Sequence, residues 1–175
     1  MGRQQGGGFA EFLIAREGGV HVLPENVTFG AAALTEPLSC CVHAALEKTT
    51  IEPTDTVLIV GPGPIGLLLA QVVKSKGAAV IMSGITRDMP RLELAKELGI
   101  DYIVDSLTND LDEIVFGLTD GYGADKVFDC SGALPAVNQA LALTAKKGTF
   151  VQVGLFAEKF NKLDEEVIIQ REINY

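Results

Sequence analysis

The sequence predicts an α/β fold in which a parallel β-sheet is covered by helices on both faces. Continuous apolar runs rich in β-branched residues, such as Thr56 to Val60, are typical of strands buried on both faces. Segments with apolar residues at helical spacing, such as 65–73, alternate with these runs for about a hundred residues. This alternation indicates right-handed crossovers between parallel strands.

The predicted elements follow one another from residue 56 to residue 153. Gly77 and Gly99 follow the first two helices, at the position where glycine commonly ends a helix. The predicted strands are 56–60, 79–82, 102–104, 126–130 and 149–153, and the predicted helices are 65–73, 90–98, 111–118 and 134–141.

The part of the chain before residue 56 carries a weaker pattern. The polar, glycine-rich stretch 1–8 predicts a loop or tail. Two short strands are expected at 9–14 and 20–23, the second of them ended by Pro24. Helical segments are expected at 31–34 and 38–46. A kink or a new helix start is expected at Pro37, which has no backbone donor.

Composition and charge exclude several classes of protein. The 175 residues include 14 Lys plus Arg and 23 Asp plus Glu, for a net charge of −9. The length suits one full domain with part of a second, and such an acidic chain is a poor candidate for binding nucleic acid. The longest apolar run, Ile65 to Ala70, is far shorter than the roughly 20 residues of a membrane helix. We therefore expect a globular protein without a signal peptide that binds neither nucleic acid nor a membrane.

Cysteine usage indicates a reducing compartment. Cys40, Cys41 and Cys130 are odd in number and two of them are sequence neighbours, so we expect free thiols and a cytoplasmic location. The sequence contains no C-x-x-C, H-x-x-x-H or H-E-x-x-H motif, which argues against a self-contained zinc site.

A glycine-rich loop joins the first predicted strand to the first predicted helix. The segment Gly61-Pro62-Gly63-Pro64-Ile65-Gly66 has the pattern G-x-G-x-x-G. In this context Gly61 permits a tight turn, Gly63 lets the backbone approach a pyrophosphate, and Gly66 lets helix and strand pack closely. The alternative is an ordinary glycine-rich turn, whereas a Walker-type loop is excluded because no Lys-Ser or Lys-Thr follows. The loop predicts a dinucleotide-binding, Rossmann-type doubly wound sheet.

The end of the second predicted strand bears on the choice of cofactor. Gly84 lies where an NAD site usually places an acid for the ribose hydroxyls. Without that carboxylate, Arg87 can make a charge-assisted contact with a 2′-phosphate, which favours NADP over NAD. In the alternative, Arg87 is a solvated charge and Asp88 binds the ribose. Arg91 is expected over the adenine, or paired with Glu93 or Glu97 on its own helix. The candidate residues here are Ser83, Gly84, Thr86, Arg87 and Arg91.

Six segments also occur in a characteristic order across nearly the whole chain. They are Phe9-Ala10-Glu11-Phe12, Glu36-Pro37-Leu38 with His43 seven residues after Glu36, Gly61 to Gly66, Arg91 to Lys96 with Leu98-Gly99, Phe128 to Gly132, and Val153-Gly154-Leu155. Together they resemble the medium-chain, zinc-dependent alcohol dehydrogenase superfamily, in particular its sorbitol, polyol and threonine dehydrogenases.

The resemblance implies an NAD(P)-binding domain at 37–175 with a truncated sixth strand, preceded by a remnant of a catalytic domain at 1–36. The full-length parent is then a homo-oligomeric oxidoreductase that uses zinc and transfers hydride between NAD(P) and a secondary alcohol or polyol. The chain lacks the Gly-His-Glu motif and the cysteine zinc ligands of the family. We therefore expect it to hold no zinc and to be inactive by itself.

The resemblance also implies roles for individual residues. In several branches an acid at the position of Glu36 reaches the catalytic zinc, directly or through water; the alternative is a Glu that caps the helix before Pro37. His43 resembles a residue near the nicotinamide, although a lone His on a helix is more often structural. Two segments, Cys130-Ser131 and Val153-Gly154-Leu155, resemble those that pass beneath the nicotinamide ribose and receive the carboxamide.

Two other functions stay open at this point. One is a stand-alone NAD(P)-binding regulatory module, which the strand-like segments within 9–23 disfavour because they have no sheet of their own to join. The other is a zinc-free relative of the quinone reductases, which the Glu36-Pro37-Leu38 block disfavours.

Overall fold

A computed structural model describes residues 6–158 and 160–175, and most of the loop or tail predicted at 1–8 lies outside this range. The chain forms two units, Met1–Thr35 and Glu36–Tyr175, which are described separately. The second unit holds the sheet and all of its covering helices.

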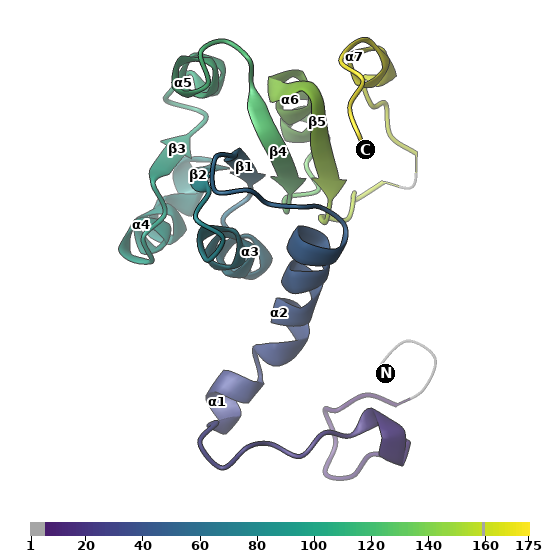
Figure 1. Ribbon diagram of the computed structural model, residues 1–175. Coiled ribbons are helices and arrows are strands. Elements are labelled where there is room, and N and C mark those ends of the chain that lie inside the picture. Colours follow the sequence, from purple (N-terminus) through teal and green to yellow (C-terminus); the bar gives the residue numbers. More distant parts are fainter. Residues whose placement is uncertain (1–5, 159) are drawn as a thin grey trace. The chain divides into compact units, whose positions relative to one another are not determined.

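The sheet of the second unit has five strands in the order β3-β2-β1-β4-β5 (Figure 1). Every pair of neighbouring strands is parallel. The chain steps outward from β1 to β3 and then returns to the other side of β1, so the carboxyl ends of β1 and β4 flank the switch point. This topology confirms the predicted Rossmann-type fold. The strands are β1 Thr56–Val60, β2 Ala79–Gly84, β3 Tyr102–Asp105, β4 Ala124–Asp129 and β5 Thr144–Gln152.

Helices cover both faces of the sheet and divide the core into two clusters. Along β1, Val57 and Ile59 face one cluster while Leu58 and Val60 face the other, as the two-residue period of a strand requires. The first cluster includes buried residues of α3 and α4, and the second includes those of α5 and α6 (Figure 1). These helices are α3 Pro64–Lys74, α4 Met89–Glu97, α5 Leu111–Leu118 and α6 Leu134–Leu143.

Two features after α6 differ from the sequence prediction. Strand β5 begins at Thr144, five residues before the predicted start at Thr149, and its first part pairs irregularly with β4. Helix α7, Glu165–Gln170, was not predicted at all. Its N-cap is Asp164, whose side chain accepts a hydrogen bond from the N–H of Val167. The available signal was an acid-rich start, Asp164 to Glu166, before three apolar residues and an amide.

The last residues of the chain run beside β5. Thr149 and Asn174 form a parallel bridge, and the N–H of Phe150 donates to the carbonyl of Asn174 at 2.8 Å. The ring of Tyr175 stacks on that of Phe150, with 5.4 Å between the centroids. A sixth strand that starts here stays a prediction.

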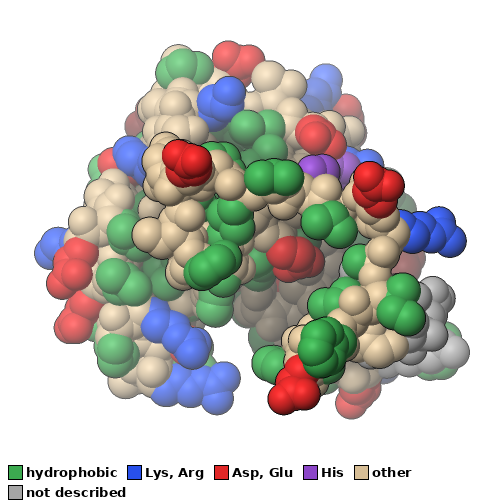
Figure 2. All heavy atoms as spheres, turned by 90° about the horizontal axis from the view of Figure 1, so that it is seen from below, with side chains coloured by type: hydrophobic (Ala, Val, Ile, Leu, Met, Phe, Trp, Pro, Cys, Tyr) green, Lys and Arg blue, Asp and Glu red, His purple; other side chains and the backbone are tan. Residues whose placement is uncertain are grey.

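The first unit contains no strand among its described residues, so the two strands predicted at 9–14 and 20–23 were wrong. A strand is stable only when another strand satisfies its backbone groups, and none of the described segments pairs with these. The unit instead has a short 3₁₀ turn, Glu17–Gly19, and helix α1, Phe29–Ala32, capped by Thr28. Figure 2 shows apolar side chains open to solvent on the face that it presents. The exposed large apolar residues of this unit include Phe9, Phe12, Ile14, Val22 and Phe29.

Helical elements follow one another from residue 29 to residue 47, with a turn at 33–34. They are α1, then α2, Thr35–Val42, and a π-helical turn η2, His43–Glu47, with Pro37 in the first turn of α2 as predicted. The stretch Phe29–Glu47 has 19 residues and a mean hydropathy of 1.2, so by length and composition alone it could cross a membrane. Inspection of apolar runs missed it because polar residues at 35–36 interrupt the run.

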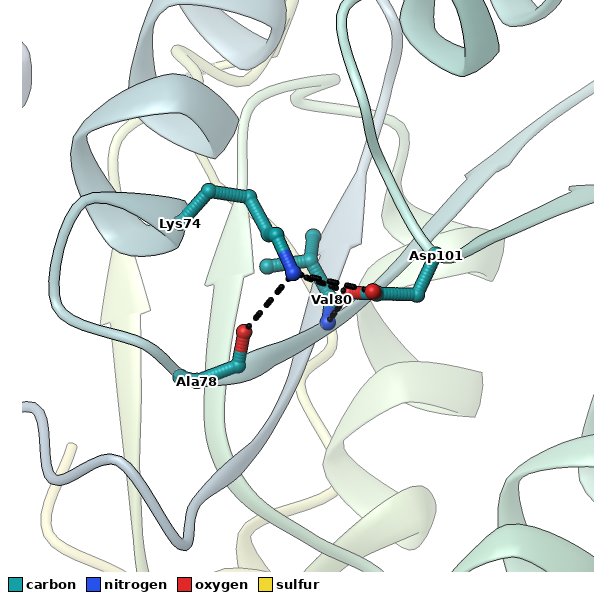
Figure 3. Close-up of polar contacts among 4 residues, drawn as sticks. All are labelled: Lys74, Ala78, Val80 and Asp101. Atoms are coloured by element: carbon teal, nitrogen blue, oxygen red, sulfur yellow. Dashed lines mark hydrogen bonds and ion pairs between the residues drawn. The ribbon is translucent and has the colours of Figure 1, made fainter.

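An ion pair fastens α3 to the sheet (Figure 3). The Nζ atom of Lys74, at the end of α3, lies 2.9 Å from both carboxylate oxygens of Asp101 and 3.4 Å from the carbonyl of Ala78. Asp101 also accepts a 2.7 Å hydrogen bond from the N–H of Val80 in β2. The pair therefore ties the end of α3 and the start of β2 to the residue that precedes β3.

The substitution Asp101→Asn is expected to lower the free energy of unfolding by about 1 kcal/mol at pH 7. Burial acts to raise the pKa of Asp101, but the hydrogen bond and charge of Lys74 and the N–H of Val80 lower it overall. Because the folded pKa is lowered, this stabilisation is present above about pH 3.9 and is lost as the pH falls through the folded value. Urea denaturation of both proteins, from pH 7 to below about pH 3.9, measures this loss of stabilisation.

Glu93→Gln provides the control for this experiment, since Glu93 is an acid on α4 with no ion pair or hydrogen bond among the described residues. It should leave the unfolding free energy within about 0.5 kcal/mol of the wild type. The wild type and Asp101→Asn should become closer in their free energies of unfolding at low pH. If this difference in free energy stayed the same, the assigned role of the Asp101 charge would be contradicted.

Candidate dinucleotide-binding site

The loop between β1 and α3 has the three glycine properties that a pyrophosphate site needs. Gly61 has φ +99°, a backbone conformation that residues other than glycine rarely adopt. Its N–H donates to the carbonyl of Ser83 at 2.8 Å. A Cβ placed on Gly66 would overlap the carbonyl oxygen of Gly61, so no larger residue fits there. A Cβ placed on Gly63 would meet nothing within 4 Å, which leaves open space beside the backbone.

The start of α3 supplies the electrostatics. Gly63 is its N-cap and Pro64 its first residue, so Ile65 and Gly66 lie in the first turn. The first N–H groups of a helix have no partner within the helix and carry a partial positive charge. An anion in the open space beside Gly63 would face these groups, so the residues present fit the pyrophosphate of a dinucleotide.

A cavity of about 140 Å³ lies next to this loop, at the carboxyl ends of β1 and β2. Buried Gly84 is in its wall, and a Cβ placed there would lie 2.9 Å from Cγ of Pro62 and 3.3 Å from Cβ of Asp88. An acidic side chain therefore has no room at this position unless the loop moves. The lining residues include Gly61, Ser83, Gly84, Arg87, Asp88 and Ser131, which brings together several of the predicted cofactor residues.

Two arginines lie at the rim of this region. Arg87 and Arg91 are exposed, and both line a second hollow of about 350 Å³ beside Asp88 and Pro90. Arg91 pairs with Asp88, with 3.6 Å between Nη1 and Oδ1, so the partner of Arg91 is neither of the glutamates that the sequence suggested. Arg87 forms no ion pair among the described residues, and its guanidinium is available to an anion.

A buried acid positions Thr86. The Oγ1 atom of Thr86 donates a 2.7 Å hydrogen bond to Oδ2 of Asp105, the last residue of β3, which is 7% exposed. This bond, with smaller help from the N–H of Leu107, lowers the pKa of Asp105 against the opposing effect of burial. Asp105 was not among the predicted residues, although an acid at a strand end was the signal that could have found it.

The two segments predicted to lie at the nicotinamide are brought together at the ends of β4 and β5. The carbonyl of Asp129 accepts hydrogen bonds from the N–H groups of Val153 and Gly154 at 2.9 and 2.8 Å. A Cβ placed on Gly132 would overlap the carbonyl oxygen of Leu155, so the two loops touch backbone to backbone. Ser131 and Leu155 are exposed beside this contact, whereas Cys130 is half-buried.

Burial keeps two of the cysteines protonated. It raises the pKa of Cys41 to about 11, with a further contribution from Cys40, and the Cys41 thiol contacts the carbonyl of Ile65 at 3.4 Å. Burial, and then the charge of Asp129, raises the pKa of Cys130 well above its usual range.

The two predicted residues on the zinc side are not drawn into this site. Glu36 is exposed in the first turn of α2, and Nδ1 of exposed His43 lies 2.6 Å from Oε2 of Glu47. Within residues 6–158 and 160–175, no three His, Cys, Asp or Glu side chains gather where a metal could bind. The described residues therefore do not fit a zinc ion.

Comparison with known proteins agrees with the fold and the glycine-rich loop described above. A family model described as zinc-binding dehydrogenase matches residues 64–175, which is more than half of the chain. The chain is 55% identical over 175 residues to D-arabitol-phosphate dehydrogenase from Enterococcus avium, covering all of this chain and 50% of that protein. It is 52% identical over 174 residues to a sorbitol dehydrogenase from Halalkalibacterium halodurans, covering 99% of this chain and 50% of that protein. The chain thus spans about half the length of the curated relatives it matches.

Solved structures share the fold. A structure of a protein from Sinorhizobium meliloti 1021 bound to NADP superposes with a TM-score of 0.72 at 34% identity, over 81% of this chain and 42% of that one. The 2R,3R-butanediol dehydrogenase of Bacillus subtilis superposes with a TM-score of 0.76 at 28% identity, over 87% of this chain and 43% of that one. With a family match over most of its length and these structural relatives, the chain belongs to the zinc-binding dehydrogenase family.

Proposed function

We propose that this chain is the cofactor-binding part of an NAD(P)-dependent dehydrogenase that transfers hydride between the cofactor and an alcohol or polyol. The observation that carries the proposal is the loop Gly61 to Gly66, with a tight turn at positive φ, an open approach at Gly63 and a close contact at Gly66. The polyol class is supported by the relatives, which include sorbitol and D-arabitol-phosphate dehydrogenases.

In this proposal each part of the chain holds one part of the dinucleotide. The start of α3 binds the pyrophosphate, and the cavity beside Gly84 takes the adenosine. The segments Cys130-Ser131 and Val153-Gly154-Leu155 hold the nicotinamide half. When bound, the nicotinamide ring supplies the chemistry of hydride acceptance and donation. The chain itself positions that ring at the carboxyl edge of the sheet, the common ligand site of open α/β folds.

The described residues do not by themselves form a zinc site. In the proposed enzyme most zinc ligands come from other residues, and Glu36 stays a predicted contact of the zinc, directly or through water. The parent is further proposed to be a cytoplasmic homo-oligomer. Sedimentation of the purified protein tests the oligomer, to which the exposed apolar residues of the first unit would contribute contact area.

We further propose that NADP binds more tightly than NAD. Position 84 has no carboxylate, and the guanidinium of Arg87 forms no ion pair among the described residues. A 2′-phosphate would therefore meet a cation at Arg87 and no acid at position 84, which supports this preference. The competing acid is Asp88, which is half-buried and already engaged with Arg91 and with the N–H of Ile85.

Arg87→Ala is therefore expected to weaken NADP binding about tenfold while NAD binding changes less than about twofold. Isothermal titration calorimetry of both cofactors measures this, with Lys96→Ala as the control, since Lys96 is an exposed cation on α4 and Arg87 lies in the 3₁₀ turn before that helix. Equal losses for the two cofactors would contradict the role of Arg87. Failure of the wild-type chain to bind either cofactor would overturn the proposed function. Gly84→Asp is a poor test of specificity, because its side chain would collide with Pro62.

A further inference from the structure

Asp129 is an acid buried at the end of β4, in the middle of the predicted nicotinamide region. Its exposed fraction is 0%, and it forms no ion pair with any residue of the described ranges. A buried carboxylate is costly unless other groups donate hydrogen bonds to it. The surroundings of Asp129 therefore need a specific arrangement of donors.

Four hydrogen bonds reach the carboxylate of Asp129. Oδ1 accepts from the N–H of Ser131 at 3.0 Å and from its Oγ at 2.6 Å. Oδ2 accepts from the N–H of Gly132 at 2.9 Å and from Nε2 of Gln152 at 2.5 Å. Three of the donors belong to the loop after β4, and the fourth is the last residue of β5.

The same residue also binds the loop after β5 through its backbone. The N–H groups of Val153 and Gly154 donate to the Asp129 carbonyl. Gln152 closes the arrangement, because its Nε2 also donates to the carbonyl of Gly154 at 2.7 Å. Each segment predicted to touch the nicotinamide half is thus bonded to Asp129 or to its direct partner.

The fit around the carboxylate leaves little freedom. A Cβ placed on Gly154 would lie 2.7 Å from Oδ2 of Asp129. The same Cβ would also overlap the backbone nitrogen of Gly132, and the backbone of Gly132 lies against that of Leu155. The distance between the two loops is therefore set by Asp129, with glycines where any side chain would separate them.

We propose that Asp129 is a positioning residue that sets the geometry of the nicotinamide half of the cofactor site. This rests on the proposed function, since the ligand is the dinucleotide. Asp129 itself is covered and touches no reacting atom. It acts through Ser131 and the backbone of 153–155, which are open to the cofactor.

Asp129→Asn tests this, because an amide has the same shape but places an NH₂ group against N–H donors. We expect at least tenfold weaker binding of NADPH, while binding of 2′,5′-ADP, which lacks the nicotinamide half, changes less than twofold. We also expect the fluorescence emission of the reduced nicotinamide to shift when NADPH binds to the wild type, and this shift should be lost in Asp129→Asn. This signal can be read directly, because the chain has no Trp.

Two further variants keep the experiment decisive. Gln152→Ala removes one donor to Oδ2. It should weaken the binding of NADPH about threefold or more, and the binding of 2′,5′-ADP less, and this test remains available if Asp129→Asn fails to fold. Asp125→Asn is the matched control, since Asp125 lies near the opposite end of β4 and accepts from the N–H of Thr56 at 2.8 Å. It should leave the ratio of NADPH to 2′,5′-ADP affinity unchanged.

The outcomes separate the two proposals. Suppose that the wild type binds both ligands, and that Asp129→Asn and Gln152→Ala reduce the two affinities equally or leave both unchanged. Asp129 is then not a positioning residue for the nicotinamide half. If the wild type binds neither ligand, the proposed cofactor function is itself wrong and the role of Asp129 falls with it. A selective loss of NADPH in either variant supports the proposal.

Discussion

Gly66→Ala is expected to lower the free energy of unfolding by about 2–3 kcal/mol, because its methyl group would overlap the carbonyl oxygen of Gly61. The neighbour is backbone and cannot rotate away, so α3 must move from β1. The melting temperature should fall by about 6–10 °C. Differential scanning calorimetry of the two proteins measures the effect directly.

Gly117→Ala is the matched control, since Gly117 lies inside α5 and a Cβ placed there meets nothing within 4 Å. Alanine favours a helix over glycine by up to about 1 kcal/mol, so this variant should be unchanged or slightly more stable. Equal melting temperatures for Gly66→Ala and wild type would mean that the contact between β1 and α3 is looser than described.

Gly63→Val is expected to weaken NADPH binding about a hundredfold with no loss of stability beyond about 0.5 kcal/mol. The backbone at Gly63 has φ −73° and ψ 178°, which a β-branched residue adopts easily, and the side chain would point into open space. That space is where the pyrophosphate must approach, so only the ligand meets the new isopropyl group. Calorimetric titration alongside thermal unfolding separates the two effects.

Gly63→Ala provides a graded comparison, because a methyl group blocks less of the same space and should cost less affinity. A Gly63→Val chain that still bound NADPH as tightly as the wild type would place the pyrophosphate somewhere other than this loop. A chain that lost stability as well would show that the loop is more crowded than its geometry indicates.

Much of the second unit could be predicted because its strands and helices each carry a strong local pattern of apolar residues. Thr56 to Val60 is apolar at every position past the first, and a strand inside a sheet buries both faces. The strand-like run at Phe9 has the same local character, yet it forms no strand. Strand pairing depends on a distant partner, which local sequence does not reveal.

The site was predictable where glycine or charge marks it and not where packing decides. The spacing of Gly61, Gly63 and Gly66 predicted the tight turn and the close helix–strand contact that the structure has, while the approach of a pyrophosphate at Gly63 stays a prediction. The collision of any residue at 84 with Pro62 depends on how two loops meet in space, which no spacing encodes. The sequence marks Asp129 only as part of a strand end, because three of its four donors come from the loop after β4 and the fourth from the end of β5.

The division of the core by the sheet has a consequence for combining substitutions. Leu69 and Leu141 belong to different clusters, one on each side of the sheet, and share no cluster member. Changes at sites without shared partners usually contribute independently to stability. Reductions in the free energy of unfolding caused on the α3 side and on the α6 side should therefore add. A substitution that weakens the packing on one side can be compensated by better packing on the other side, without a change at the sheet edge where the loops meet.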